Sequence, residues 1–286
     1  MKFNHLLAIA AILCVDGVLS NPVPAKTQVQ DAVPANDTIV FGDQFLRCEQ
    51  APNCEVYIDE RFGKSVRFKK GMEPGTPAYN ETIARYQHLS ARAPPVVGVG
   101  VGDNRINYGT TQQPHDVIWV LWDFCKQFNC GNSYIYKSTQ RVANTVAAGY
   151  WGTETHWYSM IVHAEASYSG YEQRDKMIKS ILALSRLGVT SEWVNWKTYQ
   201  YNGQNSYVSG SGSIQEFTQS DYYQITLYQG DVGSPMLADM KVWIGSDFSQ
   251  PTRGGCELIL SVLGQAASLI NPIIGIPVEA IKNAFC

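Results

Sequence analysis

The chain has 286 residues, of which 45% are hydrophobic and only 16% are charged, and its formal net charge is −3. This composition excludes a disordered polyelectrolyte, and the lack of a basic excess argues against a nucleic-acid-binding protein. All seven tryptophans lie after residue 118, so the first third of the chain holds few large core-forming residues. We therefore expect a processed leader followed by one compact domain.

The first 20 residues have the pattern of a secretory signal peptide. Lys2 gives a positive start, and the apolar run Leu6–Val15 is too short to span a bilayer as a helix. The small residues Val18 and Ser20 predict cleavage after Ser20, and a second candidate site follows Ala25. The alternative is a buried N-terminal helix. The sequence favours a secreted, extracellular protein.

Residues 21–92 are expected to form a glycosylated leader or pro-segment. They are rich in proline and carry two sequons, at Asn36 and Asn80. Strand-like pieces at 38–41 and 55–58 predict a small disulfide-pinned hairpin without a large core of its own. Lys70 and Arg92 are each followed by a small residue, as at sites cut by secretory convertases, although a Lys-Arg pair is lacking. The alternative is an uncleaved N-terminal domain joined by a proline-rich linker.

Six cysteines remain once the signal is removed, and an even number in a secreted chain predicts disulfides. Their spacing favours pairing of near neighbours, namely Cys48 with Cys54, Cys125 with Cys130, and Cys256 with Cys286. The four later cysteines could instead pair across the domain. No two cysteines have the C-x₂-C spacing of a zinc site.

Residues 93–255 are expected to form the mature α+β domain. The Gly-rich stretch 94–109 is interpreted as a flexible, apolar start. Hydrophobic periodicity predicts helices at 116–128, 138–148 and 171–187, and strands at 157–168, 192–201, 206–217, 222–228 and 239–245. The resulting fold class is α+β, with a largely antiparallel sheet, helices packed on one face, and a C-terminal hydrophobic helical hairpin.

That hairpin corresponds to residues 256–286. Residues 258–278 carry no charge, and Pro272 and Pro277 predict a break between helices at 257–270 and 278–285. The hairpin would either pack against the sheet or insert into a membrane. The apolar residues that would contact the membrane are Ile259, Leu260, Leu263, Ile270, Ile273 and Ile274.

The sequence contains no recognisable catalytic motif. A glycosidase would need two adjacent carboxylates, and the candidates Glu154, Glu165, Glu172 and Glu192 are scattered. We expect a protein that is not an enzyme and that needs neither a cofactor nor a metal. The abundance of Trp and Tyr fits either stacking on sugar rings or the ordinary preference of sheets for aromatic residues.

The organisation of the whole chain resembles that of fungal killer-toxin preproproteins. The shared features are the signal, the leader with Asn36 and Asn80, the candidate sites after Lys70 and Arg92, and a cysteine-bearing mature part with an apolar segment. The resemblance implies a secreted toxin that kills competing cells by permeabilising their membrane after docking to the wall.

Its partners would be the target-cell membrane, cell-wall glycan and a secretory convertase, but not nucleic acid, and the sequence leaves the oligomeric state open. The alternative is a secreted effector that binds glycan or a host without catalysis. A third hypothesis is that the protein is a secreted hydrolase.

Overall fold

This computed structural model describes residues 44–60, 63–87, 95–110, 112–130, 134–147, 150–201, 206–246, 252–253, 256–274 and 278–280. All of them lie in one compact unit, Thr38–Cys286. The fold is mixed α+β with antiparallel sheets, as the sequence predicts. The described strands form one two-stranded sheet and two larger sheets, whereas we expected a small hairpin before residue 93 and a single larger sheet after it.

The central sheet has six strands in the order β12-β3-β9-β10-β6-β5. Their bounds are β3 Val96–Val101, β5 Tyr134–Ala147, β6 Tyr150–Ser167, β9 Tyr222–Tyr228, β10 Met236–Ser246 and β12 Val278–Ala280. Neighbours are antiparallel except β12, which is parallel to β3. All seven residues of β9 are buried, so both faces of this strand are covered.

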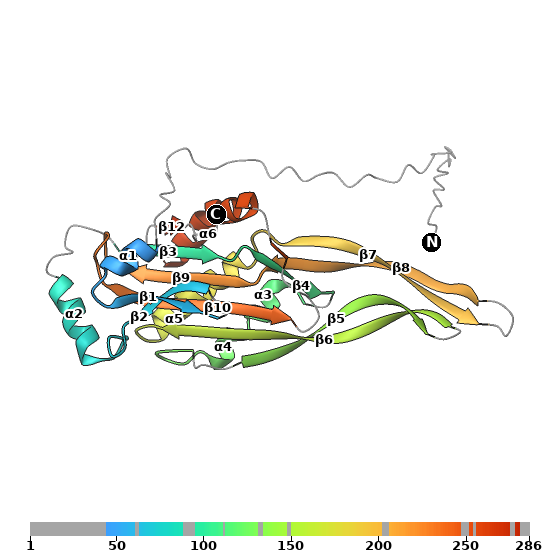
Figure 1. Cartoon of the computed structure of the whole chain (residues 1–286), viewed down its shortest axis with the longest axis horizontal. Helices are drawn as coiled ribbons and strands as arrows, with labels where there is room; N and C mark the ends of the chain where they lie inside the picture. Colours follow the sequence, from blue (N-terminus) through green and yellow to red (C-terminus); the bar gives the residue numbers. More distant parts are fainter. Residues whose placement is uncertain are drawn as a thin grey trace, which may run out of the picture. The chain divides into compact units, whose positions relative to one another are not determined.

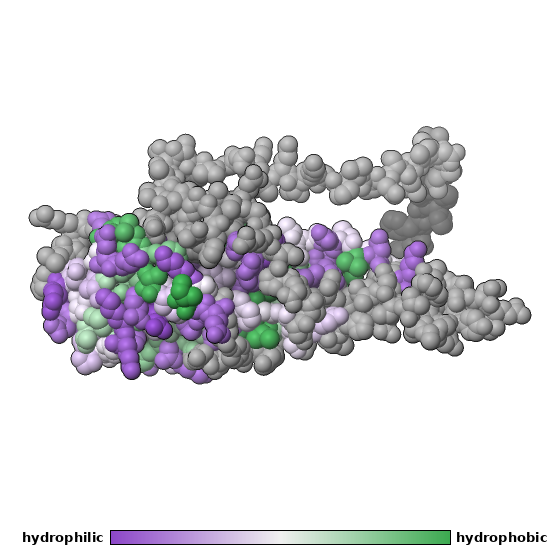
Figure 2. All heavy atoms as spheres, viewed as in Figure 1, coloured by the Kyte–Doolittle hydropathy of each residue, from purple (hydrophilic) through white to green (hydrophobic). Residues whose placement is uncertain are grey.

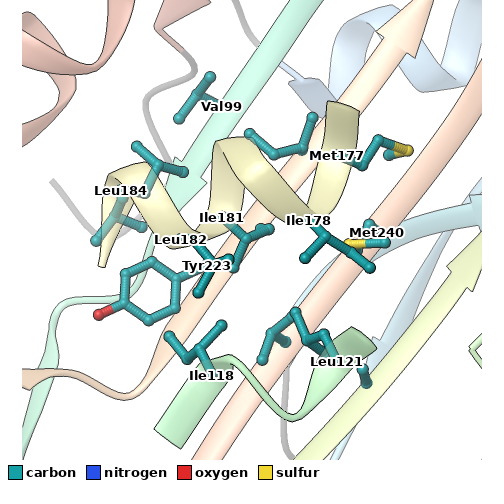
Figure 3. Close-up of a cluster of buried hydrophobic side chains, with 14 of the residues drawn as sticks. Val99, Ile118, Leu121, Met177, Ile178, Ile181, Leu182, Leu184, Tyr223 and Met240 are labelled. Atoms are coloured by element: carbon teal, nitrogen blue, oxygen red, sulfur yellow. The ribbon is translucent and has the colours of Figure 1, made fainter. Parts of the chain in front are cut away.

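One face of the central sheet packs against helices α5 (Tyr171–Leu184) and α6 (Cys256–Ile274). Figure 3 shows the α5 side chains Met177, Ile178 and Ile181 pointing toward apolar residues that include Tyr223 of β9 and Met240 of β10. Two short helices, α3 (Pro114–Ile118) and α4 (Leu121–Phe124), contribute to the same core.

The other face of the sheet is covered by the segment Gln44–Gln87, which we call the cap. It contains α1 (Gln44–Gln50), β1 (Cys54–Asp59), β2 (Gly63–Phe68) and α2 (Pro77–Gln87). Its small apolar core includes Tyr228 and Met236 of the sheet. The cap, expected as a leader, is therefore packed into the same compact unit as the body.

A second sheet has the order β11-β4-β8-β7, with β4 Asn104–Gly109, β7 Thr190–Tyr201, β8 Ser206–Ser220 and β11 Thr252–Arg253. Figure 1 shows the hairpins β5–β6 and β7–β8 extending side by side, away from the helices. Their strands have 14 and 18, and 12 and 15, residues, two to three times the usual strand length of about 5–6.

Several local predictions are confirmed and others are wrong. Helix α5 and strands β6 to β10 occur where the periodicity predicted them. Residues 94–109 are not a flexible start, because β3 and β4 occupy most of them. Residues 138–147 belong to strand β5 rather than to a helix, and the helix expected at 116–128 is split into α3 and α4.

At the C-terminus, α6 continues through Pro272 to Ile274 rather than ending at 270. Residues 278–280, expected to begin a second helix, form strand β12. The rest of that expected helix lies outside the described residues, so the helical hairpin stays a prediction. Within the described part of the chain, no helix is both long and apolar enough to cross a membrane.

Candidate functional site

The polar face of the central sheet holds a buried ion cluster where the cap meets it. Lys241 of β10 is 1% exposed, and its Nζ lies 3.4 Å from Asp239 Oδ2 and 3.3 Å from Glu165 Oε2. The same Nζ donates hydrogen bonds to the Tyr57 hydroxyl at 2.8 Å and to the Val66 carbonyl at 2.9 Å. Both of these acceptors belong to the cap.

Burial and charge pairing determine the protonation of this cluster. Burial alone would lower the pKa of Lys241, but the nearby Asp239, Tyr57 and Glu165 outweigh it and raise that pKa. Burial raises the pKa of Tyr57 to about 12, so its hydroxyl stays neutral and donates to Glu165 Oε2 at 3.1 Å. A protonated lysine has no lone pair for nucleophilic attack, and the hydrogen bonds from Lys241 to Tyr57 and Val66 join the cap to the sheet.

Further side chains of the cap bond to the backbone and side chains of the sheet. The Asn53 amide donates to the Met236 carbonyl at 2.8 Å and accepts from the Met236 N–H at 2.9 Å. Gln44 donates to Gln224, and the Tyr79 hydroxyl donates to the Leu237 carbonyl. The cap therefore satisfies polar groups of β9 and β10 that would otherwise lack partners away from water.

A cavity of about 360 Å³ lies beside this junction. It is lined by Arg67, Phe68, Glu73, Asn129, Cys130, Glu165, Ala166 and Ser167. Glu165, which lines this cavity, is engaged by Tyr57 and Lys241, and Arg67 pairs with Glu55 at 2.7 Å. Arg67 and Glu165 at this cavity are thus already paired within the protein.

A second hollow, which we call the groove, lies between the β7–β8 hairpin and the segment that enters α3. Its volume is about 450 Å³. It is lined by Thr110, Gln113, Asp116, Trp193, Ser213, Ile214, Gln215 and Phe217. The indole of Trp193 is 65% exposed, whereas Asp116 is the one ionisable residue among these lining residues. Amide, hydroxyl and aromatic groups thus dominate the groove.

At the base of the β7–β8 hairpin, strand β7 is exposed on both faces, whereas Glu216 of β8 is buried and Phe217 packs against the core. Residues 190–193, 195 and 197 of β7 are exposed, and Val194 is half-buried. Val194 lies opposite Ile214, and the next pair along, Asn195 with Ser213, is joined by a hydrogen bond from Ser213 Oγ at 2.6 Å. On the face seen in Figure 2, hydrophobic residues form separate patches between hydrophilic ones.

Two of the three disulfides that the spacing favoured are formed, Cys48–Cys54 and Cys125–Cys130. The cross-pairing of the four later cysteines is therefore wrong for Cys125 and Cys130. Cys256 begins α6, but its side chain and the whole of Cys286 lie outside the described residues. The third disulfide stays a prediction.

The predicted processing and glycosylation residues are only partly described. Ser20, Asn36 and Arg92 lie outside the described residues, whereas Asn80 is exposed on α2. Lys70 is exposed in a tight turn, closed by a hydrogen bond from the Met72 N–H to the Lys69 carbonyl at 2.9 Å. A convertase binds extended backbone, so this turn must open before the chain can be cut after Lys70.

Of the residues expected to contact a membrane, those whose side chains are described do not form an exposed apolar face in α6. Ile270 and Ile274 are buried in the core, and Ile273 packs against it. Ile259, Leu260 and Leu263 lie in α6, but their side chains are outside the described part of the structure. The described portion of α6 therefore serves as a layer of the fold.

The carboxylates considered for a glycosidase are divided between different surroundings. Glu165 joins the ion cluster, Glu172 pairs with Lys176 on the surface of α5, and Glu192 is exposed on β7. Glu154 lies in β6, but its side chain is outside the described part of the structure. Among the described side chains, no group of three or more His, Cys, Asp or Glu residues could hold a metal ion. No known protein family, curated protein or solved structure matches this chain.

Sequence reasoning missed the ion cluster and the groove. The cluster had a signal, because Asp239 and Lys241 alternate with apolar residues in β10 and so share one face. The groove had a weaker signal, since Trp193 and Gln215 meet only through the pairing of two strands.

Proposed function

We propose that the protein is a secreted toxin that permeabilises the membranes of competing cells after docking to their walls. The observation that carries this proposal is the long β7–β8 hairpin, in which residues 190–193, 195 and 197 of β7 are exposed. A two-stranded hairpin is marginally stable in water by itself, and exposed apolar groups favour contact with a partner. The long β7–β8 hairpin therefore acts as the element that reaches the target membrane.

The pairing of β7 with β8 places apolar side chains on both faces of this hairpin. Val194 and Ile214 form a pair on the face that also holds Glu192, whereas Trp193 lies on the face that holds Lys197. The Ser- and Gly-rich stretch 209–213 carries no charge. A ribbon that carries both apolar and polar side chains is suited to the boundary between lipid and water.

The experiment measures dye release from phosphatidylcholine vesicles, with and without sterol, by the purified secreted protein. Val194→Asp should fold normally, because Val194 lies outside the apolar core, yet dye release should fall by about 100-fold. A charge moved into hydrocarbon costs at least about 2.5–3.5 kcal/mol. The matched control is Ser211→Asp, which puts the same charge on the opposite face and should leave release unchanged.

Circular dichroism checks that each variant is folded. If the wild type releases no dye, or if Val194→Asp folds and releases dye like the wild type, the proposal is wrong.

A second candidate function is a secreted effector that binds glycan without harming membranes. The groove with its exposed Trp193 is the observation that favours it. Binding of glycan by a wild type that never releases dye would select this function.

A further inference from the structure

We infer that the groove beside Trp193 is a binding site for a neutral polysaccharide of the target cell wall. The inference rests on the proposed function, since it supplies the docking step that precedes contact with the membrane. It commits to sugar rather than to protein or lipid because of three features of the groove.

The first feature is the flat aromatic surface of Trp193. A large indole that is 65% exposed leaves apolar area in contact with water. One face of a pyranose ring presents C–H groups, which pack against an aromatic ring and remove that area from water. The polar edge of the indole can meanwhile stay in contact with solvent.

The second feature is the kind of polar group that surrounds the indole. Gln113 and Gln215 offer amides, and Thr110 and Ser213 offer hydroxyls, so both donors and acceptors are present. Sugar hydroxyls need both at once. The hydroxyl of Ser213 is already oriented by its bond to Asn195 Oδ1, which leaves its oxygen as an acceptor.

The third feature is charge. Asp116 is the single ionisable lining residue, and its carboxylate is held by the Gln113 backbone N–H at 3.3 Å and lies 3.3 Å from His115 Nε2. None of the described residues that line the groove is a lysine or an arginine, so these residues offer no cation to an anionic ligand such as a phospholipid headgroup. A carboxylate instead accepts hydrogen bonds from neutral sugar hydroxyls.

The position of the groove fits a docking role. Trp193 is the fourth residue of β7, close to the body, and the strand continues to Tyr201. At about 3.3 Å per residue, the end of the strand lies about 26 Å beyond the groove. Sugar bound at the base would leave the far end of the hairpin accessible to a membrane.

Binding is measured by calorimetry on the full secreted chain, with a neutral β-linked glucan oligosaccharide in one arm and an α-linked mannose oligosaccharide in the other. We expect one of the two to bind, and Trp193→Ala to weaken that binding at least tenfold. Gln215→Ala should weaken it about fivefold. The matched control is Trp119→Ala, because Trp119 is 58% exposed but does not line the groove, and its affinity should equal that of the wild type.

Failure to bind either oligosaccharide, or unchanged affinity in Trp193→Ala, overturns the inference. Dye release from sugar-free vesicles tests the proposed function separately. A protein that releases dye but binds no glycan refutes only the groove, and a protein that binds glycan but releases no dye refutes only the membrane activity.

Discussion

The two faces of the central sheet are built from alternate residues of the same strands, yet they are covered in opposite ways. In β10, Met240 and Val242 face the helices within an apolar core, whereas Asp239 and Lys241 face the cap. Alternation of this kind usually means that the polar side meets water. Here the cap excludes water from that side and supplies the missing hydrogen-bond partners. The comparison shows that polar residues in a strand do not by themselves identify a solvent-facing surface.

The largest expected effect comes from breaking the buried ion pair. Lys241→Met should destabilise the fold by about 3–5 kcal/mol, because Asp239 then stays buried without its cation. The measurement is urea unfolding followed by circular dichroism. The double variant Asp239→Asn/Lys241→Met removes both charges and should recover most of the loss. If the single variant is as stable as the wild type, the pair does not hold the cap.

Asp221 can be compared with Asp239, because it is also buried but has no lysine at hydrogen-bond distance among the described residues. Burial raises the pKa of Asp221 to about 7, although Asn104 donates a hydrogen bond to its carboxylate. Because the folded-state pKa of Asp221 is raised, the contribution of its carboxyl to the free energy of unfolding is fully present below about pH 4. It is lost progressively as pH rises to about 7.

The free energy of unfolding of Asp221→Asn should therefore rise by about 2–3 kcal/mol relative to that of the wild type when the pH is raised from 5 to 8. Thermal unfolding at both pH values measures the difference. At pH 5 the Asp221 carboxyl of the folded wild type is largely protonated, so the substitution should change the free energy of unfolding much less at that pH. The neutral amide keeps an acceptor for Asn104. An equal effect of the substitution at the two pH values would contradict the raised pKa.

The smallest of these effects concerns the contact of the cap with a strand end. Asn53→Ala removes two hydrogen bonds to the Met236 backbone and should cost about 2 kcal/mol. Limited proteolysis should then cut the cap faster than the body. Asn195→Ala, on the exposed hairpin, serves as the control and should leave the rate unchanged. If the cap of Asn53→Ala is cut no faster than the cap of the wild type, other contacts are enough to hold the cap on the sheet.

Strong local patterns made part of this fold predictable. The apolar stripe of α5 and the period-two alternation of β9 and β10 each identify an element without knowledge of its neighbours. Strand β3 was missed because Gly98 and Gly100 have low strand propensity. The alternating Val97, Val99 and Val101 are nevertheless all buried in the core.

Other errors arise because distant pairing decides the structure. Residues 138–147 have a spacing compatible with a helix, but they pair along their whole length with β6. The cap was expected to lack a core because its large residues are few, and its core is completed by Tyr228 and Met236, more than 140 residues away. The groove likewise depends on residues from three separate segments, which no local pattern brings together.

The covalent links of the cap have a consequence for any cut between the cap and the body. Both described disulfides close short loops, Cys48–Cys54 within the cap and Cys125–Cys130 within the body, so neither ties one to the other. While the chain is intact, the cap is held at a high effective concentration over the sheet. A cut between Gln87 and Pro95 turns this contact into a bimolecular equilibrium. Dilution then favours release of the cap, so the polar face of the central sheet would lose its cover as the protein concentration falls.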